Sequence, residues 1–152
     1  MTRVCGGYRA SVRLAVADER RQPALGRATV AVVDIVRVFT GDDGQSHLED
    51  VTVALEDYGM SGRISDLWPG RGVQFRTVAG DYQLDFHTAP RRQLVVNLTG
   101  FVEIEVGDGT KRILGPGSIL LAEDMTGQGH ISRSVNGEPR TCLFVHLEGP
   151  AS

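Results

Sequence analysis

The sequence predicts an all-β protein, built as one sandwich or barrel of short strands. From Val30 to Leu147, short apolar or alternating runs are separated by glycine, proline and aspartate at close intervals, as strands and turns are. No 11-residue window in this region shows a convincing 3.6-residue period, and a weak one before residue 25 predicts only a minor helix. The 152 residues, 41% of them hydrophobic, suffice for one core and one domain.

The expected strands follow one another from Val30, where the first run reads VAVVDIVRVFTG. The run FVEIEV at 101–106 alternates, with its valines and isoleucine on one face and its two glutamates on the other. The GDGT turn at 107–110, followed by KRIL, predicts a hairpin return. The other expected strands are 51–55, 72–78, 81–87, 93–100, 118–123 and 141–147. Seven or more short strands in about 120 residues imply a sandwich or barrel.

Residues 1–28 differ in composition from the rest of the chain. They hold six arginines and two acids, with Pro23 and Gly26 near their end. We interpret them as an N-terminal extension: a loosely attached arm, a swapped element, or the product of an upstream start codon. Residues 29–148 are then the folded domain.

Charge and cysteine content limit the classes of function. A net charge of −3, from 16 basic and 19 acidic residues spread along the chain, gives no footprint for nucleic acid or an anionic membrane. Cys5 and Cys142 match no metal or redox spacing, which favours a reducing compartment. No signal peptide or membrane-spanning run is present. We therefore expect a cytoplasmic protein whose partner is a small molecule.

The stretch FHTAPRRQLVVNLTG at 86–100 places polar side chains beside a run of valines and leucines. Along the chain the order is His87, Gln93, Gly100, a hairpin, Gly115-Pro116-Gly117 and finally His130. This order and spacing resemble the two-motif signature of the cupin superfamily, over about residues 47–147. The resemblance implies a single cupin-type β-barrel, a jelly-roll-like double-stranded β-helix. Exposed strand edges and the habit of the family also favour a homodimer.

The resemblance further implies a metal site, which this sequence carries in a reduced form. Ala89 stands in place of the second motif histidine, and Gln93 in place of the glutamate. What remains is His87, Gln93 and His130, which supply no charge to offset a divalent cation. We expect no cofactor. A divalent metal held by these three residues is the alternative, and it would belong to a metal-dependent cupin dioxygenase.

Two acid–base pairs are expected in a metal-free pocket. Residues two apart on a strand share a face, so Asp85 is expected beside His87, where it would raise the pKa of the histidine and fix its tautomer. The alternative for Asp85 is a turn cap or an arginine partner at the rim. Glu123 is expected to enter the pocket near His130, with a pKa raised by desolvation. Asp124 is interpreted as an exposed loop acid.

Further polar side chains are expected to hold the substrate: Gln93, Asn97, Arg91, Arg76 and Tyr82. Arg91 is preferred to Arg92 because Arg92 has the opposite parity to Gln93. Together these residues predict a small-molecule enzyme of the isomerase, cyclase or lyase type, working by general acid–base chemistry, with secondary metabolism as a setting. The alternatives are the metal-dependent dioxygenase and a non-catalytic cupin that binds a metabolite.

Overall fold

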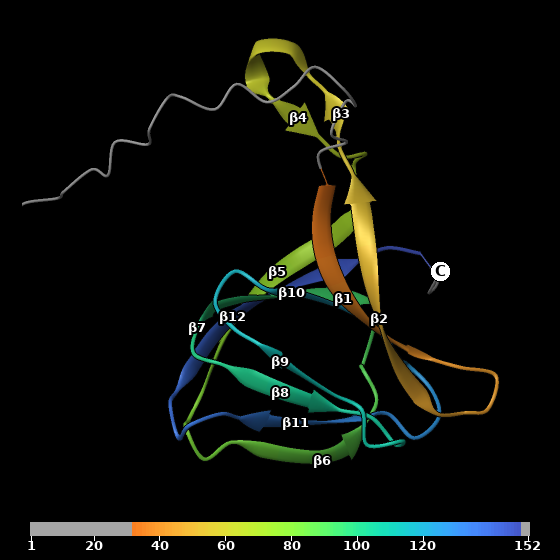
Figure 1. Ribbon diagram of the computed structural model, residues 1–152, viewed down its shortest axis with the longest axis vertical. Helices are drawn as coiled ribbons and strands as arrows, with labels where there is room; N and C mark the ends of the chain where they lie inside the picture. Colours follow the sequence, from red (N-terminus) through yellow and green to blue (C-terminus); the bar gives the residue numbers. More distant parts are fainter. Residues whose placement is uncertain (1–31, 150–152) are drawn as a thin grey trace, which may run out of the picture.

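The structure is a computed structural model and describes residues 32–149 (Figure 1). Residues 1–31 and 150–152 lie outside the described part. The expectations for the N-terminal extension at 1–28 and for the weak helix before residue 25 therefore fall outside the described residues.

The described residues are almost entirely strands, as predicted, with one short 3₁₀ helix. The elements in chain order are β1 (Val32–Thr40), β2 (Ser46–Ala54), β3 (Glu56–Asp57), η1 (Gly59–Ser61), β4 (Arg63–Ile64), β5 (Gly70–Val78), β6 (Gln83–His87), β7 (Gln93–Thr99), β8 (Val102–Glu105), β9 (Lys111–Leu114), β10 (Ile119–Glu123), β11 (His130–Ser134) and β12 (Arg140–Leu147).

Two sheets make up the body of the fold. The six-stranded sheet has the order β2-β1-β10-β7-β12-β5 and the four-stranded sheet the order β6-β11-β8-β9. The small β3–β4 hairpin projects away from both (Figure 1). Strand pairing does not join the two main sheets into a closed ring within the described residues. The architecture confirms the all-β prediction, and the packed sheets are consistent with a cupin-like fold.

Most of the strands lie where the sequence predicts them, and two differences are informative. Strand β2 begins at Ser46, well before the predicted run at 51, because its polar first half pairs with β1 along the whole strand. Strand β11, with the sequence HISRS, was not predicted. Its pattern is polar because His130 and Ser132 line an internal cavity, so the usual alternation of apolar and polar residues is missing.

The apolar core lies mainly between the two sheets. Val38, Val95 and Leu120 from the six-stranded sheet are buried in one cluster with Val102 and Ile104 from the four-stranded sheet. Fully burying side chains of this size stabilises a fold by about 1.5–3 kcal/mol each. A second cluster covers the outer face of the six-stranded sheet, with members Ile35, Leu121, Leu147 and the partly buried Trp68.

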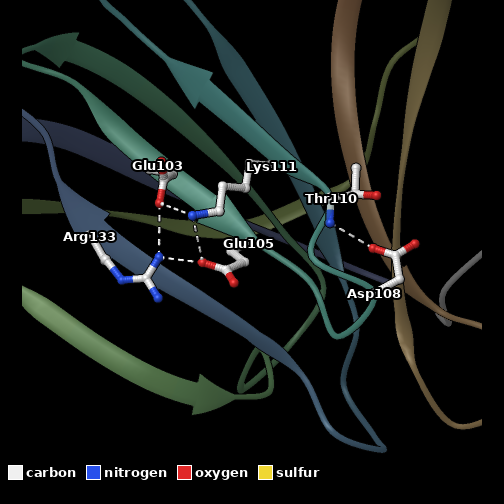
Figure 2. A network of polar contacts seen from close by, with 6 residues as sticks. All are labelled: Glu103, Glu105, Asp108, Thr110, Lys111 and Arg133. Carbon is white, nitrogen blue, oxygen red and sulfur yellow. Dashed lines mark hydrogen bonds and ion pairs between the residues drawn. The ribbon is translucent and has the colours of Figure 1, made fainter.

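The outer face of the four-stranded sheet carries charged side chains, as the alternation in FVEIEV predicts (Figure 2). Arg133 on β11 pairs with Glu103 and Glu105 on β8, at 2.8 and 2.5 Å. Lys111 on β9 contacts the same two carboxylates. The turn that joins β8 to β9 is the predicted hairpin, closed where the Thr110 N–H donates to Asp108 Oδ1 at 2.7 Å. These ion pairs link the strands on the outer face of the sheet, while the inner face lines the core and the cavity.

Candidate functional site

A cavity of about 250 Å³ lies between the two sheets. This is close to the lower end of the range for pockets that enclose small molecules. The predicted site residues that line it are His87, His130, Gln93, Asn97, Arg76, Tyr82 and, at an exposed position, Arg91. The structure thus brings the residues of the two sequence motifs together. Asp85 and Glu123 do not line the cavity.

The two motif histidines face each other across neighbouring strands. His87 ends β6 and His130 begins β11, and the two residues are directly opposite in the antiparallel pairing. Their ring centroids are 4.4 Å apart. Gly129 makes this close pairing possible, because a Cβ atom there would lie 2.1 Å from the carbonyl oxygen of His87 and because its φ is +80°.

His130 is held by a buried carboxylate. Its Nδ1 lies 2.6 Å from Asp124 Oδ2, and the hydroxyl of Ser46 donates to the same oxygen at 2.9 Å. Asp124 is completely buried. An ionised carboxylate only accepts hydrogen bonds, so Nδ1 of His130 carries the proton and Nε2 keeps its lone pair.

The prediction that Asp124 is exposed is therefore wrong, and so is the placement of Glu123 in the pocket. Leu120 and Ala122 line the cavity, whereas Leu121 belongs to the outer cluster, so the inward parity of β10 is the opposite of the predicted one. Glu123 points to the outer side. The carboxylate that serves His130 comes from the first residue after the strand.

Glu123 instead joins two arginines. Arg37 Nε donates to its Oε2 at 2.6 Å, and Arg92 Nε donates to its Oε1 at 2.5 Å. Burial raises the pKa of Glu123, but the hydrogen bonds from Arg92 and Arg37 outweigh it, so the pKa lies below its ordinary value. The predicted rise is wrong. Glu123 is a structural ion-pair residue that connects β10 to β1 and to the segment before β7.

Asp85 contacts His87 through its backbone and not through its carboxylate. The His87 Nδ1–H donates to the carbonyl oxygen of Asp85 at 2.8 Å, and the Asp85 side chain is exposed. A bulge in β6, between the partners of His130 and Ser132, breaks the two-residue alternation on which the prediction rested. The carbonyl still fixes the tautomer of His87, leaving Nε2 as the lone pair. Burial lowers the pKa of His87 below its ordinary value, the opposite of the predicted rise.

A second group of polar side chains lies deeper along β7 and β12. Gln93 is buried opposite His146 in the β7–β12 pairing, and His146 Nε2 lies 2.8 Å from Gln74 Oε1. Gln93 Oε1 and His146 Nδ1 have no hydrogen-bond partner within the described residues. Buried acceptors of this kind suit a ligand that brings a hydroxyl or N–H group.

Sequence reasoning missed His146 and Arg140, which both line the cavity. Arg140 opens β12 and is 4% exposed, and its Nη1 donates to Asn97 Oδ1 at 2.7 Å. The other end of the Asn97 amide donates from Nδ2 to the carbonyl oxygen of Leu114 at 3.3 Å. The signal available in the sequence was the parity of β12, which places Arg140, Cys142, Phe144 and His146 on one face.

The side chains present do not fit a divalent cation. His87 and His130 offer Nε2 atoms and Gln93 a neutral amide oxygen, while the carboxylate of Asp124 does not line the cavity and holds His130 and Ser46 through its Oδ2. No group of three or more His, Cys, Asp or Glu residues within 32–149 is placed to hold a metal ion. A site without an anionic ligand matches poorly what zinc, iron or manganese prefer. The chemistry proposed below therefore uses only the side chains of the cavity.

Fold and site together define an all-β protein of two packed sheets, consistent with a cupin-like fold, with a partly open cavity between the sheets. No protein-family model matches the sequence. No curated protein matches it either. In the described part of the chain, no helix is long and apolar enough to cross a bilayer.

Three solved structures are similar to parts of the chain. The conserved SPY1581 protein of unknown function from Streptococcus pyogenes shares 20% identity over 53% of this chain and 66% of its own, with a TM-score of 0.42. The protein NMB1881 from Neisseria meningitidis shares 18% identity over 56% of this chain and 89% of its own, with a TM-score of 0.40. A protein assigned to ethanolamine utilization (protein Q) from Salmonella typhimurium shares 15% identity over 82% of this chain and 100% of its own, with a TM-score of 0.40.

Proposed function

We propose that the protein is a small-molecule enzyme of the isomerase, cyclase or lyase type, which moves protons on a substrate held between the two sheets. The observation that carries this proposal is the Asp124–His130 hydrogen bond of 2.6 Å, with the ring of His87 4.4 Å from that of His130, inside a cavity. A histidine oriented by a buried carboxylate, with Nε2 free to accept, is the arrangement of a general base.

In the proposed reaction, His130 Nε2 takes a proton from a carbon next to a carbonyl group. The electron pair of the broken C–H bond passes to the carbonyl oxygen, which becomes an enolate oxygen. Asp124 stabilises the imidazolium that forms, and the arginines of the cavity stabilise the enolate. The enolate oxygen then returns its electron pair and the carbonyl group re-forms: either another carbon of the conjugated system takes the imidazolium proton, which gives an isomer, or the C–O bond to a neighbouring carbon breaks and the departing oxygen takes that proton, which gives an elimination product.

The other residues of the cavity have positioning roles in this proposal. Gln93 Oε1 and His146 Nδ1 would accept hydrogen bonds from substrate hydroxyl groups, since neither has a partner within the described residues. His87 also offers a neutral Nε2, and its lowered pKa keeps it uncharged near neutral pH. It serves as a second hydrogen-bond acceptor beside His130.

Metabolite profiling tests the proposal. The purified protein is incubated with a metabolite extract, beside His130→Gln and an outer-face control, Arg133→Gln, and the mixtures are compared by mass spectrometry. We expect wild type and Arg133→Gln to deplete the same small metabolite and to form a product of equal mass or of a mass lower by a small leaving group, and His130→Gln to do neither. A metabolite that is bound by all three proteins but consumed by none would show a binding protein instead.

A further inference from the structure

Arg140 is a buried charge without a counter-charge. Its guanidinium is held by the neutral amide of Asn97, its Nε has no hydrogen-bond partner, and no Asp or Glu within the described residues forms an ion pair with it. Burying an ionised group is costly unless it is paired. In agreement with this, burial lowers the pKa of Arg140.

The orientation of Asn97 leaves Arg140 no alternative partner on that side. The amide nitrogen of Asn97 is committed to the Leu114 carbonyl, so its oxygen faces the arginine. Asn97 is 1% exposed and cannot turn into solvent. Asn97 therefore positions the guanidinium at the cavity but contributes no negative charge.

A second guanidinium lies in the same cavity. Arg76 on β5 stands over the rings of Tyr82 and Phe144, at 5.0 and 5.6 Å from their centroids. Its charge acts on both Arg140 and His87, because it lowers the pKa of each. Arg76 therefore lies close enough to both Arg140 and His87 to act on their charges.

The arginines are the side chains that give the cavity lining its charge. They are Arg76, Arg91 and Arg140, and the lining includes no aspartate or glutamate. The acid nearest to it, Asp124, lies behind His130. An enclosed surface with charges of one sign raises the local concentration of small ions of the opposite sign.

We propose that Arg140 and Arg76 form a carboxylate-binding subsite, so that the ligand of this cavity is a small organic acid. Arginine recognises carboxylates through paired N–H donors, and Arg140 is held in place by Asn97 in advance. The cavity of about 250 Å³ has room for a small organic acid, whose remaining atoms then lie toward His87 and His130. That this acid is also the substrate rests on the function proposed above, whereas its binding does not.

Matched acids and amides test the subsite. Acetate, pyruvate and lactate, together with acetamide, pyruvamide and lactamide, are titrated into the full chain, and binding is followed by NMR shifts of the arginine Nε–H groups and by thermal unfolding. We expect at least one acid to bind saturably at millimolar concentration and its amide to bind at least about 10-fold more weakly, since a charge-assisted hydrogen bond contributes about 1.5–3 kcal/mol. Equal binding of acid and amide, or no saturable binding of any acid, overturns the proposal. Inorganic phosphate is run in parallel, and binding of phosphate alone overturns the assignment to carboxylates.

Single substitutions locate the binding and separate it from catalysis. Arg140→Gln and Arg76→Gln should each weaken the acid at least about 10-fold, Arg140→Lys should recover part of the affinity, and the outer-face variant Arg133→Gln should bind as wild type. Unaltered affinity in Arg140→Gln overturns the subsite. His130→Gln should still bind the acid, so failure of the proposed catalysis would leave the subsite standing.

Discussion

His130 and Asp124 form the tightest polar contact of the cavity wall, with Nδ1 and Oδ2 2.6 Å apart and the carboxylate completely shielded from solvent. The contact joins the first residue of β11 to the loop after β10. It fixes both the direction of the imidazole ring and the nitrogen that carries the proton, so the base proposed for catalysis is set by the fold before any ligand arrives.

Replacing Asp124 by asparagine should loosen this base. We expect Asp124→Asn to lower the free energy of unfolding by about 1–3 kcal/mol, as loss of a buried partner does, and to remove the preference of His130 for a protonated Nδ1. Urea unfolding and ¹⁵N NMR of the histidine rings measure the two effects. The matched control is Asp43→Asn at the exposed Asp43–His47 pair, 3.0 Å apart, which should be little changed. Equal effects at the two sites would contradict the role given to Asp124.

Glu123→Gln should destabilise the protein in a pH-dependent manner. The pKa of Glu123 is lower in the folded state than its ordinary value of 4.5, so its ion pairs stabilise the fold fully above that pH and are lost as pH falls through the folded pKa. We expect wild type to exceed the variant by about 1–3 kcal/mol near pH 7, and this gap to shrink below pH 4.5. Chemical unfolding at several pH values measures the gap. A gap that stays constant down to pH 3 would show that the fold does not lower the pKa of Glu123.

His87 should titrate below the ordinary histidine value of 6.5, because burial disfavours its charged form. The unfolded chain then takes up a proton at a higher pH than the folded chain. This contribution to stability is therefore complete above pH 6.5 and is lost as pH falls through the folded pKa. An NMR titration of the His87 ring checks the value, and His87→Asn should remove this part of the pH dependence. A midpoint above 6.5 for His87 would contradict the burial seen here.

Gly129→Ala should push apart the ends of β6 and β11 at which His87 and His130 pair. Its Cβ would meet the His87 carbonyl, and its positive φ is unfavourable for alanine by roughly 1–3 kcal/mol even before that clash. We expect a lower unfolding temperature and altered ring shifts for both His87 and His130. Gly72→Ala is the matched control, because that glycine has open space around it and no positive φ. Similar losses in both variants would remove the special role of Gly129.

The sequence was sufficient for most of the strands and for several residues that line the cavity, but not for β11, for Arg140, or for the carboxylate that holds His130. Hydrophobic alternation and turn residues located β7, β8 and β10, and the spacing of His87, Gln93 and His130 brought the motif residues together. The two-residue alternation along β6 and β10 did not predict correctly which carboxylate lies beside each histidine. A bulge next to Asp85 and an inverted face at Glu123 depend on tertiary pairing, which no local pattern encodes.

Arg140 and Asp124 show a second limit of sequence reasoning. Arg140 follows a proline in a turn-like stretch, and Asp124 stands in an acidic loop, so each resembles a surface residue. Their burial is decided by packing partners far away in the chain, Asn97 for one and Ser46 for the other. Such partners become visible only when the strands are assembled into the fold.

Proton exchange with solvent tests the central claim most directly. Small carboxylic acids from a metabolite extract are incubated with the protein in D₂O, and the gain of deuterium on carbon is followed by mass spectrometry. If His130 takes a proton from carbon, one acid should gain deuterium next to its carbonyl group with the wild-type protein and Arg133→Gln, and not with His130→Gln. Binding of that acid in the cavity with no exchange above the rate in buffer alone would contradict the account.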